Sequence, residues 1–251
     1  NCAASGTEII KRLGEQSTAE AKPIIYTSAD SVLQIAANED VIPLSELYTM
    51  CEKARQIMSG DYAVGRVIAR PFKRGAEGFY RTENRRDYSL PPHDETMLDR
   101  LKARGFAVKG VGKIKDIFSG RGLTEHIEAH SNDEAYGAVI NELDKDFTGL
   151  VFVNLVDTDM LFGHRNDIEG YRKCVERFDE FLGRLMDRMR ADDAVIVTAD
   201  HGCDPATPST DHSRENVPYL YWHKNITPQN LGTILGFDFV AQTIEKLLVL
   251  D

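Results

Sequence analysis

Two short apolar runs with a long amphipathic segment between them constrain the fold of this 251-residue chain more than any other feature. The first run covers residues 150–156 and is almost uninterrupted, and the second covers residues 194–198. Runs of this length suit strands that are buried on both faces of a parallel sheet. Between them, apolar residues recur at three- and four-residue spacing from Ile168 to Met189, which predicts a long helix.

The same alternation of strand and helix extends over much of the chain. It predicts strands at residues 23–27, 64–69 and 106–111, and helices at residues 43–58, 95–104, 131–144 and 237–248. We expect Pro71 to end the second of these strands and a polar stretch to follow at residues 73–87. The pattern indicates an α/β protein with a doubly wound, mainly parallel sheet.

The dipeptide Pro91-Pro92 is the strongest break in this pattern, and we expect a domain boundary there. It divides the chain into residues 1–90 and residues 91–251. The first part carries 12 basic and 12 acidic side chains, whereas the second carries 18 and 28. The net charge of −10 therefore belongs to the second part.

Composition and charge exclude several classes of protein. A hydrophobic content of 42% is too high for a disordered chain, and no apolar run approaches the roughly 20 residues that cross a bilayer. The acidic excess argues against a nucleic-acid or anionic-membrane partner, because both need a sustained positive field. An acidic surface suits a site that collects metal cations, but a solvated surface is the commoner cause.

The N-terminus and the cysteines indicate how the protein is processed and in which cellular compartment it lies. The chain begins with Asn1 and lacks a signal peptide, so either processing has removed a segment or the chain is part of a longer one. The four cysteines stand far apart without a C-x-x-C pair. We therefore expect no disulfide framework and a cytoplasmic protein.

Polar clusters follow both apolar runs, where ligands bind in open α/β sheets. One lies at residues 156–164 and the other at residues 198–204, with a Thr-Asp-His turn at residues 210–212. Asp and His bind divalent metals, and their joint placement favours a metal site over isolated turn residues. Cys203 is either a soft ligand or, more commonly for such a residue, a small buried side chain. The candidate metal ligands are Asp159, His164, Asp200, His201 and His212.

Longer motifs resemble a known family. Residues 198–202 and 210–215 resemble the metal-binding core of the alkaline phosphatase superfamily, and residues 154–165 resemble phosphopentomutase. Residues 4–9, 26–34 and 65–72 also resemble phosphopentomutase. This resemblance implies an alkaline-phosphatase-type core with a smaller α+β cap domain. It also implies an isomerase that interconverts ribose or deoxyribose 1-phosphate and 5-phosphate, through a phosphorylated threonine and two Mn²⁺ ions.

The resemblance also implies roles for individual residues. Asp159, His164 and His212 would hold one metal, and Asp200 and His201 would hold the other. The remaining Asp ligand and the nucleophilic Thr would come from an N-terminal segment absent here, so these 251 residues alone should lack turnover. The metal identity rests on the resemblance, since Asp and His suit Zn²⁺ or another divalent metal nearly as well.

The pentose phosphate substrate would be held by residues outside the metal cluster. Seven basic residues lie between residues 66 and 86, and most suit a solvated face. Arg66, Arg81 and Lys113 are the candidates for contacts with phosphate. Ser28 and Asp30 are candidates for sugar hydroxyls, although Asp30 also suits a simple turn.

Three alternatives remain on the sequence alone. A cofactor-independent phosphoglycerate mutase and a phosphatase of the same superfamily share the metal pattern, but residues 26–34 and 65–72 count against both. The third is a non-catalytic metal-binding fragment, which gains support if these 251 residues are the whole natural protein.

Overall fold

The computed structural model describes residues 4–28 and 32–248, and the chain forms two compact units. The N-terminal unit comprises Asn1–Asp94 and Asp116–Arg121, and the C-terminal unit comprises Glu95–Lys115 and Gly122–Asp251. A short return segment therefore joins the N-terminal unit after the chain has entered the C-terminal one.

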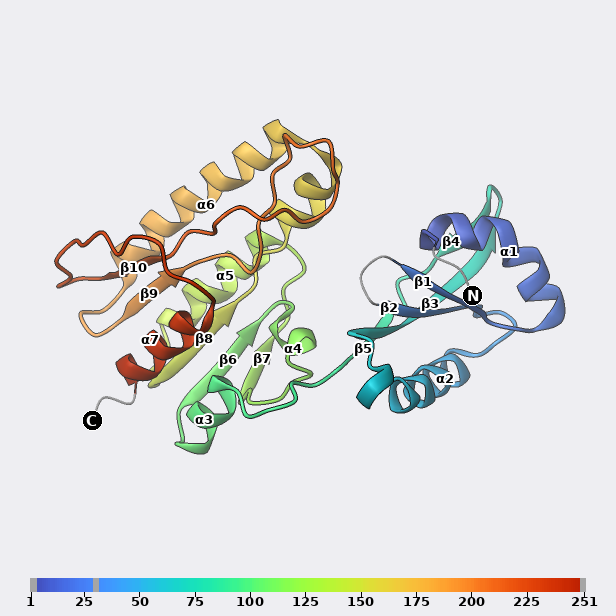
Figure 1. Cartoon of the computed structure of the whole chain (residues 1–251), viewed down its shortest axis with the longest axis horizontal. Helices are drawn as coiled ribbons and strands as arrows, with labels where there is room; N and C mark the ends of the chain where they lie inside the picture. The colour runs from blue at the N-terminus through green and yellow to red at the C-terminus, as the bar shows by residue number, and fades with distance from the viewer. Residues whose placement is uncertain (1–3, 29–31, 249–251) are drawn as a thin grey trace. The chain divides into compact units, whose positions relative to one another are not determined.

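The N-terminal unit is a five-stranded mixed sheet with a helix on each face (Figure 1). β1 pairs with β2 in antiparallel register, β2 pairs with β3 in parallel, and β3 then pairs with both β4 and β5. The elements are α1 (Gly6–Glu20), β1 (Ile24–Ser28), β2 (Val32–Asn38), α2 (Leu44–Ile57), η1 (Gly60–Tyr62), β3 (Arg66–Gly75), β4 (Gly78–Arg81) and β5 (Arg86–Ser89).

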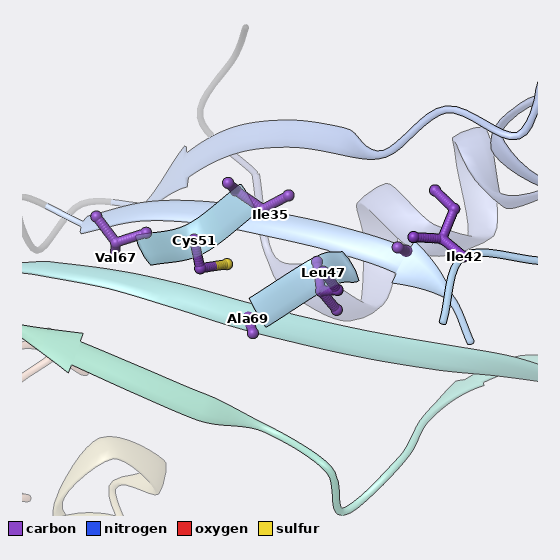
Figure 2. Close-up of a cluster of buried hydrophobic side chains, with 7 residues drawn as sticks. Ile35, Ile42, Leu47, Cys51, Val67 and Ala69 are labelled. Carbon is purple, nitrogen blue, oxygen red and sulfur yellow. The ribbon is translucent and has the colours of Figure 1, made fainter. Parts of the chain in front are cut away.

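Alternating side chains of β2 and β3 give this sheet two buried faces. Leu47 and Cys51 of α2 pack on one face, against Ile35, Val67 and Ala69 (Figure 2). The other face packs against α1 through a cluster that holds Ile9, Ile10, Tyr26 and Phe72. The two helices therefore bury both faces of the sheet, which explains why β3 is apolar at most of its central positions.

Pro71 does not end its strand as expected, because β3 runs on to Gly75. Pro71 lies where the second partner of β3 changes: residues 66–69 pair with β5, and residues 72–75 pair with β4. No ladder hydrogen bond on that side needs an N–H from Pro71, so a proline is tolerated. The polar stretch at residues 73–87 contains β4 and the start of β5, two strands that were not predicted from the sequence.

The C-terminal unit is an α/β structure, which confirms the predicted fold class. Its parallel three-stranded sheet has the order β7-β6-β8, and a separate antiparallel pair joins β9 and β10. The elements are α3 (Met97–Ala103), β6 (Ala107–Val111), α4 (Ile114–Ile117), β7 (Glu125–Ile127), α5 (Asn132–Leu143), β8 (Gly149–Val153), η2 (Thr158–Phe162), η3 (Gly163–Arg165), α6 (Ile168–Arg188), β9 (Ala194–Val197), β10 (Leu220–His223) and α7 (Asp238–Leu248).

Helices α5 and α6 supply the main apolar cluster of this unit. Tyr136 of α5 stacks on Phe181 of α6 with ring centroids 4.2 Å apart, and Leu185 and Met189 complete the buried group. This packing follows from the three- and four-residue spacing of apolar side chains along α6. No helix in the described part of the chain is long and apolar enough to cross a membrane.

The expectation that residues 150–156 and 194–198 form strands buried on both faces is wrong. β8 ends at Val153, and its side chains are only half-buried. β9 is also half-buried or exposed, and its partner β10 is antiparallel. Among residues 4–28 and 32–248, β8 and β9 each pair with one neighbouring strand only. Each is therefore more exposed than a strand with neighbours on both sides.

Candidate metal centre

Two loops that follow β8 and β9 carry the candidate ligands. After β8, the chain turns into the π-helical segment η2, where the N–H of Met160 donates to the carbonyl of Val156 at 2.9 Å. This segment presents Asp159, and the next turn, η3, presents His164. The loop after β9 carries Asp200 and His201.

A short antiparallel bridge between Gly202 and Ser213 brings the third segment to the same place. The N–H of Ser213 donates to the carbonyl of Gly202 at 3.0 Å, which positions His212. A Cβ atom on Gly202 would lie 2.6 Å from the carbonyl oxygen of Ser213. Glycine is therefore needed here because two backbone segments approach closely.

The side chains gather around Asp159. Its Oδ1 atom lies 3.3 Å from Nε2 of His164 and 3.3 Å from Nε2 of His212. The rings of His201 and His212 stack with centroids 3.6 Å apart, and those of His164 and His212 are 5.0 Å apart. One ligand atom each from Asp159, His201 and His212 lies within 4.8 Å of the others, as in a metal-binding cluster.

Hydrogen bonds orient two of these imidazoles. Nδ1 of His164 lies 2.6 Å from the carbonyl oxygen of Thr210, and Nδ1 of His201 lies 3.0 Å from that of Gly202. A carbonyl only accepts, so each Nδ1 donates its proton there, and Nε2 is the nitrogen of each ring that can bind a metal. Histidine ligands in metal sites are commonly held in this way.

Asp159 provides the clearest test of whether these residues fit a metal. Its Oδ1 atom is buried and has no hydrogen-bond partner among the described residues. An uncompensated buried carboxylate oxygen is costly, and a cation beside it would remove that cost. Oxygen and imidazole nitrogen donors together suit divalent transition metals. The residues therefore fit a divalent metal ion.

Asp200 lies at the exposed side of the cluster. Its side chain is 67% exposed, and its Oδ1 atom lies 3.6 Å from Nε2 of His201. The resemblance places His201 with Asp200 and a second metal, whereas the structure places the His201 ring against His212. The ligands expected for the first metal (Asp159, His164 and His212) therefore lie next to His201, which was expected to bind the second.

Two neighbouring residues from the sequence analysis lie beside the cluster. Cys203 is half-buried, and a Cβ atom on Gly163 would lie 2.3 Å from its Sγ atom, so the thiol packs between the two loops. Burial raises the pKa of the Cys203 thiol, which suits a packing role. The exposed Lys113 lies in the C-terminal unit, where its Nζ atom is 3.0 Å from Sδ of Met160 on η2.

The other candidate substrate contacts belong to the N-terminal unit. Arg66 is exposed at the start of β3 and lies 3.7 Å from a carboxylate oxygen of Asp87. Arg81 ends β4, where one of its guanidinium nitrogens would lie 3.5 Å from a Cβ atom on Gly6, the first residue of α1. Ser28 ends β1, but its side chain lies outside the described structure, as does the whole of Asp30.

Sequence reasoning missed two further arginines in this unit. Arg70 lies on β3, where its Nε atom donates to Oε1 of Gln34 at 2.8 Å. Burial lowers the pKa of Arg70, and the charges of Arg85 and Arg81 lower it further. Arg70 thus lies within electrostatic reach of both Arg81 and Arg85, and Arg81 lies beside Gly6 at the N-terminus of α1, an environment that suits an anion. The density of basic residues between 66 and 86 was the available signal, but it did not show which side chains converge.

Sequence reasoning also missed Asn166. Its backbone adopts the left-handed conformation with φ 52°, which asparagine tolerates better than most residues. Its Nδ2 atom donates to the carbonyls of Thr207 and Ser209 at 2.8 and 2.9 Å. Asn166 therefore ties the segment before His212 to the turn that carries His164.

Comparison with known proteins agrees with a metal-dependent enzyme. Residues 15–251 match the family model described as the Metalloenzyme superfamily. The chain is 55% identical over its full length to a protein named phosphopentomutase from Carboxydothermus hydrogenoformans, and covers 65% of it. It is 54% identical over 98% of its length to a phosphopentomutase from Caldanaerobacter subterraneus subsp. tengcongensis, and covers 63% of that protein.

The chain thus spans slightly less than two thirds of these two relatives. A solved structure of a protein from Pyrococcus horikoshii is 16% identical and has a TM-score of 0.45, with coverage of 73% of this chain and 53% of that one. The family model covers all five candidate ligands and most of both structural units. The chain belongs to the Metalloenzyme superfamily.

Proposed function

We propose that this chain is the greater part of a phosphopentomutase, which interconverts ribose or deoxyribose 1-phosphate and 5-phosphate with two divalent metal ions. The identity of 50–55% to several phosphopentomutases supports this activity. The observation that carries the proposal is the buried Oδ1 atom of Asp159, which lacks a hydrogen-bond partner among the described residues and lies 3.3 Å from two imidazole nitrogens.

Each metal-site residue has a distinct task in this proposal. Asp159, His164 and His212 would bind one ion. Asp200 and His201 would supply two of the ligands of the other. The hydrogen bonds from Nδ1 of His164 to Thr210 and from Nδ1 of His201 to Gly202 orient the two rings, and Nε2 of each would bind the metal. When bound, the metals would neutralise charge on the transferred phosphoryl group and align the attacking and leaving oxygens.

The N-terminal unit would hold the phosphate that does not react. A mutase must bind the same sugar phosphate in two orientations, so it needs an anion site apart from the metals. Arg66 and Arg81 are our candidates for this role, with Arg70 and Arg85 nearby. Arginine suits the task because its planar donors bind phosphate in a bidentate manner. Lys113 of the C-terminal unit would supply a further cation.

The finer features rest on the resemblance to phosphopentomutase. We infer Mn²⁺ as the metal, although the Asp and His donors suit Zn²⁺ nearly as well. We also infer that the N-terminal unit acts as the cap and that the nucleophilic Thr comes from outside these residues. The free Cys51, Cys174 and Cys203 support a cytoplasmic location, where thiols stay reduced.

The metal site can be tested by calorimetric titration of the metal-free protein with MnCl₂ and ZnCl₂. We expect one tighter site and one weaker site, because the first ligand set is complete within the chain and the second is not. His212→Ala should abolish the tighter site, whereas His93→Ala should leave it unchanged, since His93 is an exposed residue of the other unit. A tighter site that survives in His212→Ala would contradict the assignment.

The activity requires a separate assay. With Mn²⁺, the protein extended by the segment that carries the nucleophile should convert ribose 1-phosphate to ribose 5-phosphate, and the 251-residue chain should not. Turnover of 3-phosphoglycerate or of an aryl phosphate in preference to ribose 1-phosphate would instead identify a phosphoglycerate mutase or a phosphatase. Metal binding without turnover in the extended protein would favour the non-catalytic alternative.

A further inference from the structure

A buried asparagine outside the candidate metal centre contacts the loop that carries Asp159. Asn132 is the first residue of α5, and it is only 4% exposed. Its Oδ1 atom accepts hydrogen bonds from the N–H of Val156 at 2.8 Å and from the N–H of Asp157 at 3.1 Å. In return, the Oδ2 atom of Asp157 accepts the backbone N–H of Asn132 at 2.9 Å.

These hydrogen bonds restrain residues 156 and 157, which lie directly before η2. The carbonyl of Val156 accepts the N–H of Met160, so both polar groups of Val156 are engaged, one by Asn132 and one by η2. Asp159 stands only two residues beyond Asp157, so a shift of residues 156–157 would move its carboxylate. The three hydrogen bonds between Asn132 and residues 156–157 are called the Asn132 clamp below.

The helices that carry the clamp are themselves well fixed. The side chain of Ser131 caps α5 by accepting the N–H of Glu134. The Nδ2 atom of Asn132 lies 3.5 Å from Sγ of the buried Cys174 on α6, which orients the side-chain amide. The stacked rings of Tyr136 and Phe181 join α5 to α6 farther along. Asn132 therefore links the packed helices α5 and α6 to the loop that carries Asp159.

We infer that Asn132 is a positioning residue for the metal centre, which holds the Asp159 loop in its metal-binding geometry through hydrogen bonds to residues 156 and 157. This inference rests on the proposed metal site and deepens it. Without the asparagine oxygen, two sheltered N–H groups would lose their partner, and the loop would have to move to satisfy them. A ligand that is no longer held in place binds metal more weakly.

The test is a calorimetric titration of the metal-free protein with MnCl₂, together with thermal unfolding of the metal-free form. Asn132→Ala should raise the dissociation constant of the tighter site about 10-fold or more, because supporting residues of metal sites commonly have effects of this size. Ser131→Ala is the matched control, since it weakens the same end of α5 without touching residues 156–157. It should lower the unfolding temperature but change the dissociation constant less than about 2-fold.

The outcomes separate this inference from the metal site itself. If the wild-type protein binds no Mn²⁺, both the metal site and the clamp are wrong. If the wild type binds and Asn132→Ala binds equally well, only the clamp is wrong. If Ser131→Ala weakens binding as much as Asn132→Ala, Asn132 acts through the stability of α5 and the positioning role is overturned.

A second pair of variants keeps the test decisive if Asn132→Ala does not fold. Asp157→Ala and Asp157→Asn lose the same charge near the metal, but the asparagine keeps an oxygen that can accept the N–H of Asn132. Asp157→Ala should therefore bind Mn²⁺ several-fold more weakly than Asp157→Asn. Equal dissociation constants for the two variants would contradict the clamp.

Discussion

The carboxylate of Asp159 joins candidate ligands that are far apart in the sequence. His164 is near it in the chain, whereas His212 comes from a loop 53 positions later, yet both Nε2 atoms lie 3.3 Å from the same oxygen. A lone aspartate in a turn would be exposed and hydrogen-bonded to water. The sheltered Oδ1 atom of Asp159 instead lacks a hydrogen-bond partner among the described residues, a cost that a bound cation would remove.

The arginines of the N-terminal unit should act on binding of the substrate rather than on the metal. In the extended enzyme, Arg66→Ala removes one charge-assisted hydrogen bond, worth about 1.5–3 kcal/mol, so kcat/KM for ribose 5-phosphate should fall about 10- to 150-fold. Arg74→Ala is a suitable control, because Arg74 lies on the same strand but pairs with Glu15. Steady-state kinetics with metal analysis measures both effects.

Metal content distinguishes this role from that of the candidate ligands. It should stay at the wild-type value in Arg66→Ala and fall in Asp200→Ala, where the loss of kcat/KM should also be far larger. Loss of metal from Arg66→Ala, or unchanged kcat/KM, would show that Arg66 does not hold the phosphate.

The pairing of β6 with β8 depends on a glycine. Gly149 lies opposite Ala107 in the parallel register, and a Cβ atom on it would be 1.9 Å from the Ala107 carbonyl oxygen. The strands would have to separate, so Gly149→Ala should lower the free energy of unfolding by about 1–3 kcal/mol. Gly137→Ala, in α5 with open space around its Cβ position, should raise it by about 0.5–1 kcal/mol. Urea denaturation of both variants tests the pair, and similar effects of the two changes would contradict the register.

A buried ion pair connects β6 to α5. The Nζ atom of Lys109 lies 2.7 Å from Oε2 of Glu142, and the two residues are 7% and 3% exposed. Lys109→Met leaves the carboxylate buried without its main partner and should cost about 3 kcal/mol in unfolding free energy. Combining it with Glu142→Leu should recover most of that loss, because the uncompensated charge is then removed. A double variant no more stable than Lys109→Met would contradict this explanation.

The same pair makes a pH-dependent contribution to stability. Burial raises the pKa of Glu142, but hydrogen bonds from Lys109 and Lys145 outweigh burial and lower it below its ordinary value of 4.5. The unfolded state therefore binds a proton more readily, so the contribution is complete above pH 4.5 and is lost as the pH falls through the folded pKa. Glu142→Gln should show a shallower loss of unfolding free energy between about pH 6 and pH 3. Identical pH profiles for variant and wild type would contradict the lowered pKa.

The two units have separate cores, and the candidate metal ligands belong to only one of them. All five lie in the C-terminal unit, Glu95–Lys115 and Gly122–Asp251. Because a ligand stabilises only the state that binds it, Mn²⁺ at 100 times its dissociation constant should add about 2.7 kcal/mol to the stability of that unit. Differential scanning calorimetry should show two transitions, of which one moves to higher temperature with Mn²⁺.

The shifted transition can be assigned with variants already described. His212→Ala should abolish the shift, and Gly149→Ala should lower the same transition without metal, because both residues lie in the C-terminal unit. A shift of both transitions by equal amounts would contradict metal binding within one unit.

Local periodicity was enough to predict several elements. Apolar spacing predicted a helix at residues 43–58 and a long helix up to Met189, and the structure has α2 at Leu44–Ile57 and α6 at Ile168–Arg188. These predictions succeeded because a helix buries one stripe of side chains, and that stripe is visible within a single segment. The α/β class followed from the alternation of such segments with short apolar runs.

Strand pairing was less visible in the sequence. β2, β4, β5, β7 and β10 were not predicted from the sequence, and β3 was expected to stop at Pro71. Whether a segment forms a strand depends on its neighbour in the sheet, and that neighbour is often distant in the chain: β9 pairs with β10 more than twenty residues later. The burial of β8 was overestimated for the same reason, since an apolar run does not reveal how many neighbours it has.

The candidate ligands could be named from their residue types and their place after two apolar runs, because ligands of open α/β sheets bind at the carboxyl ends of the strands. The resemblance to phosphopentomutase suggested how to group these ligands, but the contacts between distant segments could not be predicted from the sequence. The stacking of His201 on His212, the convergence of Arg70, Arg81 and Arg85, and the contact of Asn132 with residues 156–157 all join distant segments. The amino-acid sequence thus specifies which chemical groups are present and the local structure that carries them. Long-range packing specifies which of those groups meet, because contact distances depend on how helices and strands pack rather than on spacing along the chain.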